Sequence, residues 1–381
     1  MDIRKEFKTI SSFDILEKLS EKYEYEFGMK PYDVSYWDPS PEFLNEMINC
    51  LHFIYPQDVI SYNYTYLLKE KKAILQSLGF DPKIKDCIIT PNGTASIMLV
   101  SHWLKCHHVK KLNLIHPAYF SIVNNCFNDD ISITNIETDI INQYNLNINP
   151  LDFKNEFFWC SNPLYSTGFH LSDSHINILT ELIENDNVLI LDECVSRKNF
   201  ELSHILGNHK NFIGIYAPHK SICVNGVKFS IIVFNQEDEP FFDQSIDFLC
   251  GGINTASISA INHYLSKEYD LYNKIFYGKI IKTNKFVDDI CSRYKNTYYD
   301  YKSIHYLKTV YFPNIPAELG LNLDFIWNAI RSTGTIFIPG CLNHFPSNAG
   351  LSFRINLARD SPQFRASITR LIMYFCRFPH F

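Results

Sequence analysis

The chain has 381 residues, of which 46% are hydrophobic, and a formal net charge of −6. It can therefore bury a sizeable core, and its charge offers no general attraction to nucleic acid or anionic membranes, so we expect neither as a partner. Its first residues lack the apolar stretch of a signal peptide, no segment reaches the ~18 apolar residues of a membrane span, and the 11 cysteines are scattered. These features predict a soluble cytoplasmic protein with reduced thiols.

Three helices are predicted in the first part of the chain. Residues 11–23 form a short capped helical pattern, and 40–54 form another with Pro41 at the first helical position. The third helix covers 94–104 and follows Asn92-Gly93.

Short apolar runs then alternate with helical segments. Each run has the length and composition of a buried strand, and they lie at 112–117, 157–163, 187–193, 212–218 and 229–235. Strands separated by helices indicate a mainly parallel sheet between two layers of helices.

The C-terminal third of the chain has a different pattern. One long helix is predicted over 268–294, followed by a mixture of strands (306–312, 335–340, 353–358), a helix at 324–333 and a final amphipathic helix from Ser361. We therefore predict an α/β protein with a large domain at 46–280, a small α+β domain at 281–381, and an N-terminal segment, 1–45, that packs near the small domain.

Two charged residues stand at the ends of predicted buried strands. Asp192 ends the run NVLIL, and a carboxylate there needs a partner: it could cap a helix, bind a metal or pair with a protonated ring nitrogen. Lys220 follows FIGIYAPH, although lysine is seldom fully buried. Alternatively, Lys220 is a surface lysine whose aliphatic carbons are buried while its amine reaches solvent. Ligands bind at the carboxyl ends of strands in such sheets, so both are candidate site residues.

A third candidate is Asn92-Gly93-Thr94, which lies between the strand-like CIIT and a helix. Free N–H groups at that helix start would hold a phosphate, although an ordinary Asn-Gly turn is the alternative. Cys106-His107-His108 lacks the spacing of a metal site, and we expect no metal. Common nucleotide, zinc-finger and serine-hydrolase motifs are missing from the sequence.

The order of these motifs resembles that of the class I/II aminotransferases, from about residue 30 to residue 360. The stretch TGTIFIPGCLNHFPSNAGLSFRINLAR (333–359) is especially similar to that family. The other matching segments, in order, are Asn92-Gly93-Thr94, Pro117-Ala118-Tyr119, Ser161 to Gly168, Asp192-Glu193 and Lys220 to Lys228. The resemblance implies a divergent member with the fold-type-I architecture, in which pyridoxal 5'-phosphate is the cofactor.

The resemblance also implies roles for single residues. Lys220 would join the cofactor as a Schiff base, Asp192 would keep the ring nitrogen protonated, and Tyr119 would stack on the ring, unless it serves only the core. Arg354 would grip the substrate α-carboxylate, with an ordinary ion pair as the alternative.

The phosphate would lie near Asn92, Gly93 and Thr94, with Lys228 at the usual position of an arginine. In the family, active sites lie at a two-fold interface. The resemblance therefore implies a homodimer in which Tyr62 and the stretch Gly251–Ser257 contribute to the neighbour's site.

Four residues depart from the family pattern: Tyr165 replaces an asparagine, Val195 a tyrosine, Ala217 a serine and Lys228 an arginine. The asparagine and tyrosine normally contact the cofactor's phenolic oxygen, so we expect Tyr165 to take over as donor. In the alternative, the loop is rearranged and Asn162 turns inward to donate. His219, beside the lysine, could relay a proton.

The leading hypothesis is an aminotransferase that moves an amino group between an amino acid and a 2-oxo acid. One alternative keeps the cofactor but performs elimination, cyclisation or oxidation in specialised amino-acid biosynthesis, because the altered residues would surround the cofactor. A second alternative is a non-catalytic protein of the same fold.

Overall fold

The computed structural model describes residues 12–44, 69–140, 142–226, 228–294, 296–343 and 350–377. Its largest element is a seven-stranded sheet, and all five strands predicted in the middle of the chain belong to it. In spatial order its strands are β2 (Lys85–Thr90), β10 (Ser230–Asn235), β9 (Phe212–Tyr216), β8 (Val188–Glu193), β7 (Phe157–Ser161), β3 (Lys111–Ile115) and β4 (Ser132–Ile136).

The sheet is mainly parallel, and β10 is the exception. The pairs β9–β8, β8–β7, β7–β3 and β3–β4 are parallel, whereas β10 is antiparallel to both β9 and β2. In the described part of the connection between β9 and β10, the only helix is α9 (Pro218–Ser221), which has four residues. A single turn is too short to carry the chain back along the sheet, so β10 reverses direction.

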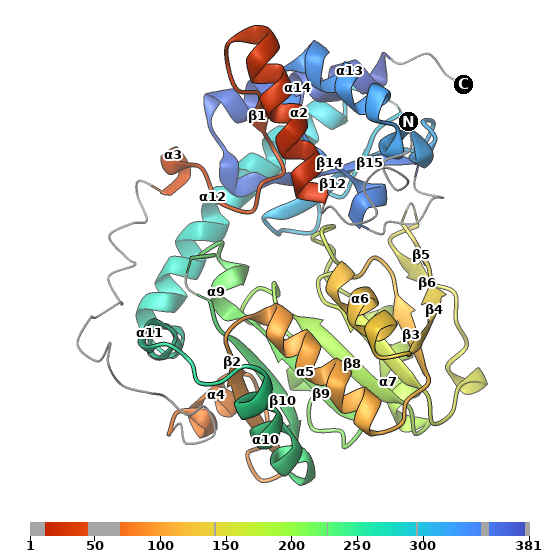
Figure 1. Ribbon diagram of the computed structural model, residues 1–381, viewed down its shortest axis with the longest axis vertical. Coiled ribbons are helices and arrows are strands. Elements are labelled where there is room, and N and C mark those ends of the chain that lie inside the picture. The colour runs from red at the N-terminus through yellow and green to blue at the C-terminus, as the bar shows by residue number, and fades with distance from the viewer. Residues whose placement is uncertain are drawn as a thin grey trace.

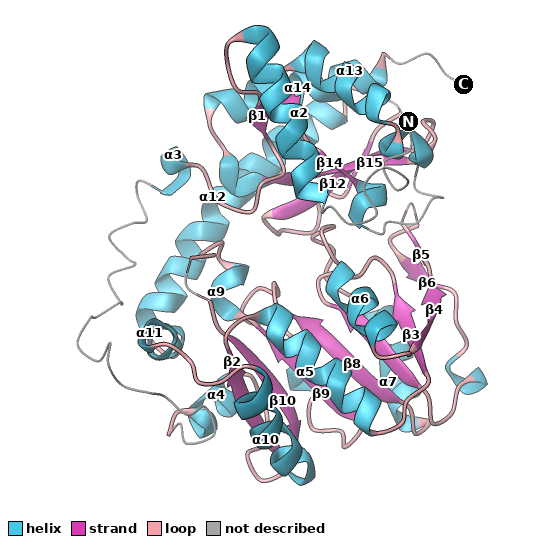
Figure 2. Cartoon of the chain, viewed as in Figure 1, coloured by secondary structure: helices cyan, strands magenta, loops and turns pink. Residues whose placement is uncertain are grey.

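Both faces of this sheet are covered. Neighbouring side chains on a strand point to opposite faces, and on β2 they enter two different core clusters: Ile88 joins one, and Cys87 and Ile89 join the other. The first cluster includes side chains of α5 (Gly93–Cys106), α6 (Phe120–Asn128) and α10 (Glu239–Leu249), which lie in front of the sheet in Figure 2. The second includes side chains of α4 (Lys71–Ser77) and α7 (Asp173–Glu184).

A smaller antiparallel sheet is built from the C-terminal third of the chain. Its order is β11 (Tyr298–Tyr299), β12 (Leu307–Phe312), β15 (Leu351–Asn356) and β14 (Ile338–Pro339). The helices α13 (Leu323–Thr333) and α14 (Pro362–Cys376) pack near it, and Ser361 caps α14. The long helix α12 (Lys267–Cys291) runs from α11 (Thr255–Tyr264), beside the large sheet, up to this smaller unit (Figure 1).

The remaining elements are short, apart from the N-terminal helix. The helix predicted at 11–23 is α2 (Ser12–Phe27), and Pro41 begins α3 (Pro41–Leu44); the rest of the helix predicted to residue 54 lies outside the described residues. The others are β1 (Tyr32–Asp33), β5 (Thr138–Asp139), β6 (Asn145–Leu146), α8 (Ser203–Leu206) and β13 (Thr335–Ile336), with single 3-10 turns at Pro150–Asp152, Gln236–Asp238, Ala317–Leu321, Gly340–Asn343 and Leu357–Arg359.

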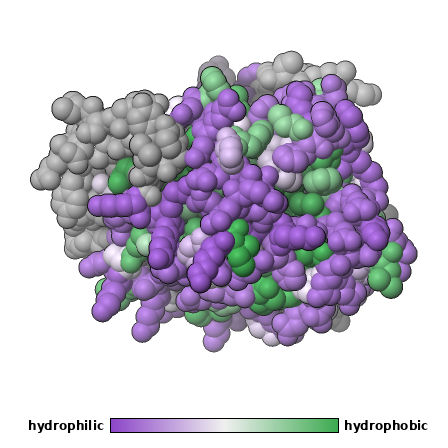
Figure 3. Space-filling model, turned by 90° about the horizontal axis from the view of Figure 1, so that it is seen from below, coloured by the Kyte–Doolittle hydropathy of each residue, from purple (hydrophilic) through white to green (hydrophobic). Residues whose placement is uncertain are grey.

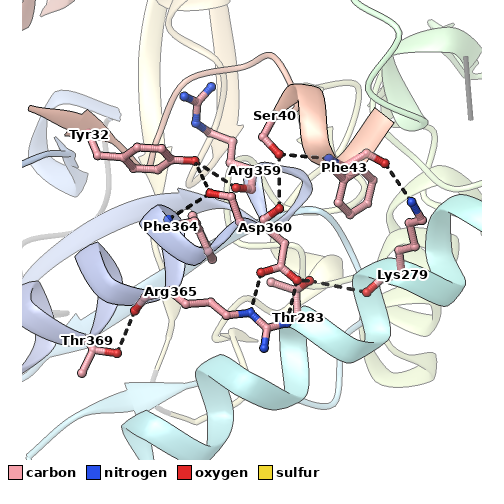
Figure 4. Close-up of polar contacts among 11 residues, drawn as sticks. Tyr32, Ser40, Phe43, Lys279, Thr283, Arg359, Asp360, Phe364, Arg365 and Thr369 are labelled. Atoms are coloured by element: carbon pink, nitrogen blue, oxygen red, sulfur yellow. Dashed lines mark hydrogen bonds and ion pairs between the residues drawn. The ribbon is translucent and has the colours of Figure 1, made fainter. Parts of the chain in front are cut away.

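The N-terminal segment from residue 32 to residue 44 is fixed to the C-terminal part of the chain. β1 pairs with β13, and the Tyr32 hydroxyl donates to the Arg359 carbonyl at 3.0 Å. At its other end, Lys279 of α12 donates to the Phe43 carbonyl at 2.9 Å. Figure 4 shows these contacts converging where α12 passes the start of α14.

Asp360 lies at the centre of this junction. Its carboxylate accepts two hydrogen bonds from Arg365, at 2.7 and 2.8 Å, and one from Thr283 of α12 at 2.9 Å (Figure 4). Its carbonyl accepts a hydrogen bond from Ser40 at 3.2 Å. One residue therefore joins the N-terminal segment, α12 and α14.

The end of the molecule that carries the large sheet has a mostly hydrophilic surface. In the view from below, hydrophobic residues lie scattered between polar ones (Figure 3). Among the described residues, no helix is both long and apolar enough to cross a membrane.

Candidate active site

A cleft lies where the carboxyl ends of the large-sheet strands face the smaller unit. It consists of two adjoining cavities of about 30 and 820 Å³. Trp37, Gly93, Thr94, Tyr119 and Lys220 line both of them. Because these residues come from the N-terminal segment, α5, the start of α6 and the turn after β9, the fold gathers distant parts of the chain at one place.

Lys220 is held by its backbone while its amine lies in the cleft. Its N–H donates to the Ala217 carbonyl at 2.9 Å, and its carbonyl accepts from the Tyr306 hydroxyl at 2.8 Å. Its Nζ lies 4.8 Å from the centre of the Trp37 ring and 5.4 Å from that of Tyr119. Two aromatic rings flank the amine and both cavities reach it, so a ligand in the cleft can meet it.

Asp192, the last residue but one of β8, is a buried carboxylate that lines the smaller cavity. Its Oδ1 accepts the N–H of Cys194 at 3.1 Å. Burial raises the pKa of Asp192, an effect that the Cys194 hydrogen bonds and the positive charge of Lys220 partly offset. A cation placed in the smaller cavity would therefore stabilise this carboxylate.

Tyr119 and Tyr165 bring two phenols to the smaller cavity. Their ring centres are 5.3 Å apart, with the planes tilted by 59°. Burial raises the pKa of Tyr119 to about 12, although a hydrogen bond with the Thr94 side chain opposes the shift. Tyr119 immediately precedes α6, in the connection that follows the end of β3 at Ile115.

The larger cavity has the features of an anion site at its α5 end. Asn92 caps this helix by accepting the N–H of Ala95 at 3.0 Å. Gly93 and Thr94 belong to the first turn, so their N–H groups have no acceptor within the helix. Both residues line the cavity, as does the exposed Lys228. A helix N-terminus with a lysine beside it favours a phosphate.

Arg354 lies near Tyr165 but lines neither cavity. Burial raises the pKa of the Tyr165 phenol, and the positive charge of Arg354 partly offsets that shift. Arg354 is 1% exposed, its Nη2 donates to the Ser35 carbonyl at 2.8 Å, and its guanidinium lies 4.5 Å from the centre of the Trp37 ring. Its Nε is buried and has no hydrogen-bond partner among the described residues. A buried donor of this kind favours an added acceptor such as a carboxylate.

Asn162 does not reach the cleft. Its Nδ2 donates to Glu193 at 2.6 Å and to the Phe200 carbonyl at 3.0 Å, and its Oδ1 accepts the Leu171 N–H at 3.1 Å. It lines neither cavity, whereas Tyr165 lines the smaller one. The alternative in which Asn162 turns toward a cofactor therefore disagrees with the geometry.

His219 also lies away from the cleft. It is buried 3.0 Å from His263, burial lowers its pKa to about 3, and it lines neither cavity. A proton relay through His219 therefore has no support.

Two other expectations concern Tyr62 and metal ions. Tyr62 lies outside the described residues. Among those that are described, no group of three or more His, Cys, Asp and Glu side chains is placed to hold a metal ion.

Several cleft residues were not singled out from the sequence. Trp37 and Tyr36 come from the N-terminal segment, Asn225 from the turn before Lys228, and Leu307 from the start of β12. The substituted positions Val195 and Ala217 line the smaller and the larger cavity respectively. Trp37 belongs to the loop 34–40, which the family resemblance implies is one of those that set substrate specificity, but the loop's sequence does not reveal which of its side chains face the cleft.

No protein-family model matches the chain, and a search of curated protein sequences finds no match. Solved structures do match. The YbdL protein of Escherichia coli, for which a methionine aminotransferase function is identified, aligns over 96% of this chain and 98% of its own, with a TM-score of 0.74 and 14% identity. The L,L-diaminopimelate aminotransferase of Chlamydomonas reinhardtii aligns over 96% of each chain, with a TM-score of 0.74 and 11% identity.

A third match differs in activity. The C-S lyase of Staphylococcus hominis, solved with pyridoxal phosphate bound, aligns over 92% of this chain and 94% of its own, with a TM-score of 0.71 and 15% identity. These matches confirm the fold expected from the sequence: the chain has the α/β architecture of the fold-type-I aminotransferases.

Proposed function

We propose that this protein binds pyridoxal phosphate in the cleft and transfers the amino group of an α-amino acid to a 2-oxo acid. One observation carries the proposal: the amine of Lys220, the buried carboxylate of Asp192 and the ring of Tyr119 line the same small cavity. If Lys220 were only a surface lysine and Asp192 only capped a helix, the two side chains would have no reason to line the same cavity as the Tyr119 ring.

The residues of the cleft fit the cofactor. The Lys220 amine would hold it covalently, and the carboxylate of Asp192, whose pKa burial raises, would gain a cationic partner in the protonated ring nitrogen. The ring of Tyr119 would cover one face. The phosphate would lie at the anion site, against Gly93, Thr94 and Lys228.

When bound, pyridoxal phosphate withdraws electrons from the substrate Cα and carries the amino group between the two substrates. Substrate binding and proton transfer depend on the protein's own residues. Arg354 binds the substrate α-carboxylate through donors that the fold has already oriented. The Nζ of Lys220 moves the proton at the substrate Cα, because it is the only amine that lines the smaller cavity among the described residues.

Labelling of Lys220 tests the proposal. The purified protein, with pyridoxal phosphate added, should be yellow and absorb near ~410–430 nm. Reduction with borohydride followed by peptide mapping should place the label on Lys220. Lys228 lines the larger cavity and serves as an internal comparison, since both lysines belong to the same short stretch of chain.

Two results would overturn the assignment. A label on Lys228 would mean that the wrong lysine has been chosen. A Lys220→Ala protein that still acquires the colour and transfers amino groups would show that the cavity is not the catalytic centre.

A second candidate function keeps the cofactor and changes the reaction to elimination, cyclisation or oxidation. The observation that favours it is that two residues that depart from the family pattern line the smaller cavity. The side chain of Val195 cannot donate a hydrogen bond, whereas the hydroxyl of Tyr165 can. The C-S lyase of Staphylococcus hominis has the same fold. Product analysis with and without 2-oxo acids separates the two: amino-group transfer requires the acceptor, whereas elimination proceeds without it.

We also propose that the protein is a cytoplasmic homodimer. Within the chain, Ser257 donates to the Lys228 carbonyl at 2.8 Å, so this end of the stretch Gly251–Ser257 lies beside the chain's own anion site, and the stretch's contribution to a neighbour's site stays a proposal. Phe248 and Leu249, just before this stretch, are exposed apolar side chains that an interface would cover.

A further inference from the structure

We propose that the hydroxyl of Ser161 is a second hydrogen-bond donor to the phenolic oxygen of bound pyridoxal phosphate. The inference rests on the proposed function, since it adds a cofactor-binding residue to that same cleft. Ser161 would replace the donor that is lost at Val195, where the aminotransferases that this chain resembles have a tyrosine. It is the last residue of β7 and lines the smaller cavity.

Ser161 brings a buried hydroxyl without a partner to this cavity. The residue is 3% exposed, and its Oγ has no hydrogen-bond partner among the described residues. The large majority of buried polar side-chain atoms in proteins are hydrogen-bonded, because a buried donor that lacks an acceptor is costly. A buried hydroxyl that lines a cavity and has no partner in the protein therefore favours a ligand that supplies an acceptor.

The strand register places Ser161 beside Asp192. The two residues are opposite each other in the parallel pair β7–β8, and neighbouring strands lie about 4.8 Å apart. Two residues earlier, Trp159 and Ile190 are paired in the same way, and both belong to the core cluster on the α5 side of the sheet. Because side chains alternate between the two faces of a strand, Ser161 and Asp192 also face that side.

Asn162, the next residue, faces the opposite side of the sheet. It donates to Glu193, the residue after Asp192, at 2.6 Å, and neither Asn162 nor Glu193 lines a cavity of the cleft. The polar side chain that the end of β7 presents to the cleft is therefore that of Ser161.

The order of the strands indicates which edge of the cofactor Ser161 would meet. The anion site at the start of α5 follows β2, and the sheet runs from β2 through β10, β9 and β8 to β7, so Asp192 lies between the anion site and Ser161. On the pyridine ring, the phosphate arm and the phenolic oxygen lie on opposite sides of the axis through the ring nitrogen. With the nitrogen at Asp192 and the phosphate at the anion site, the phenolic oxygen faces β7.

Tyr165 and Ser161 would then share the phenolic oxygen. They are four residues apart in the chain, and both line the smaller cavity. Each donor favours the anionic form of this oxygen and so weakens its hold on the imine proton. Val195 has no donor in its side chain, and Ser161 would bring the number of donors back to two.

The holoprotein with pyridoxal phosphate bound tests this. The pH midpoint of the cofactor's absorbance gives the pKa of its imine. Ser161→Ala should raise that midpoint by about 0.5 to 1 unit, as expected for the loss of one neutral hydrogen bond. Ser161→Cys keeps the size of the side chain but has only a weak donor, so it should raise the midpoint as well, and it replaces the alanine variant if that does not fold.

Binding of two cofactors distinguishes a contact with the phenolic oxygen from a structural role. Ser161→Ala should weaken the binding of added pyridoxal phosphate about 2- to 10-fold. It should not change the binding of 3-deoxypyridoxal phosphate, which lacks the phenolic oxygen. A serine that only shaped the cavity would affect both compounds equally.

Ser196→Ala is the matched control. Ser196 is 4% exposed and directly follows Val195, and its Oγ also has no partner among the described residues, but it lines neither cavity. Its removal should leave the midpoint and both affinities unchanged. The other titratable residues that line the smaller cavity are the same in every variant, so a difference in midpoint reports the serine: Tyr119, Tyr165, Asp192, Cys194 and Lys220.

The outcomes separate the two proposals. An unchanged midpoint in both Ser161 variants overturns the inference, as does equally weakened binding of the two cofactors or an equal shift in Ser196→Ala. A protein that acquires no colour with pyridoxal phosphate overturns the proposed function, and the inference with it.

Discussion

Tyr165 shows how one substitution can connect two parts of the cleft. Its phenol stands where the aminotransferases that this chain resembles have an asparagine, and it lines the smaller cavity, where the positive charge of Arg354 partly offsets the rise in its pKa that burial causes. An asparagine side chain is shorter and would reach less far. In this protein the proposed donor to the cofactor and the proposed carboxylate-binding group are therefore coupled electrostatically.

Replacing Tyr165 with phenylalanine should raise the pKa of the bound cofactor's imine by roughly a unit or more, because a hydrogen bond that favours the anionic phenolic oxygen is lost. A pH titration of the cofactor absorbance measures the midpoint.

Asn162→Ala is the comparison. It should leave that midpoint unchanged but lower the free energy of unfolding by about 1–3 kcal/mol, since Glu193 loses a buried donor. The reverse pattern, with a raised midpoint only in Asn162→Ala, would show that Tyr165 is not the donor.

For single residues, the sequence was informative where a candidate site residue lies at the end of a predicted strand. Asp192 and Lys220 were candidate site residues because each stands at the end of a predicted buried strand, and the carboxyl ends of parallel strands lie at one edge of a sheet. The role of Tyr119 was implied only by the family resemblance, and all three residues line the smaller cavity. Trp37 could not be predicted in the same way. Its place depends on hydrogen bonds from Asn356, 319 residues away, and no local pattern encodes such a contact.

Among the helices, two glycines occupy opposite environments. Gly334 ends α13 with φ of 64°, a left-handed conformation, and a Cβ there would lie 3.0 Å from the Tyr23 hydroxyl. Gly278 lies inside α12, exposed to solvent, and a Cβ there would have no atom within 4 Å.

The same substitution should therefore have opposite effects. Gly334→Ala should lower the free energy of unfolding by about 1–2 kcal/mol, because an alanine in the left-handed region is strained. Gly278→Ala should raise it by up to about 1 kcal/mol, because alanine favours the helix. Denaturant unfolding measures both. Two changes of the same sign would mean that these backbone conformations do not control the effect.

Most elements were predictable because their periodicity and caps are local properties. The helices α5, α12 and α14 begin within one residue of where the sequence placed them. The antiparallel direction of β10 was not predicted, because strand composition carries no information about direction. The short connection through α9 was the available signal.

For the whole molecule, the main test is its association state. The proposed homodimer should sediment at twice the mass of the chain. Phe248 is 79% exposed, next to the stretch Gly251–Ser257, and Phe248→Glu should raise the dimer dissociation constant about 10- to 100-fold. Phe127, which is 81% exposed on α6, provides the control: Phe127→Glu should have no effect. A wild-type monomer with full activity would contradict the proposal.

The cleft also constrains the order in which the protein can mature. Trp37 and Asn356 are joined by a hydrogen bond across nearly the whole chain, and Ser35 reaches Arg354 in the same way. During synthesis the large sheet can form once β10 has left the ribosome, whereas these contacts must wait for β15. A nascent chain with a complete large sheet would therefore still lack an ordered Arg354, so the proposed carboxylate-binding group reaches its place only in the last stage of synthesis.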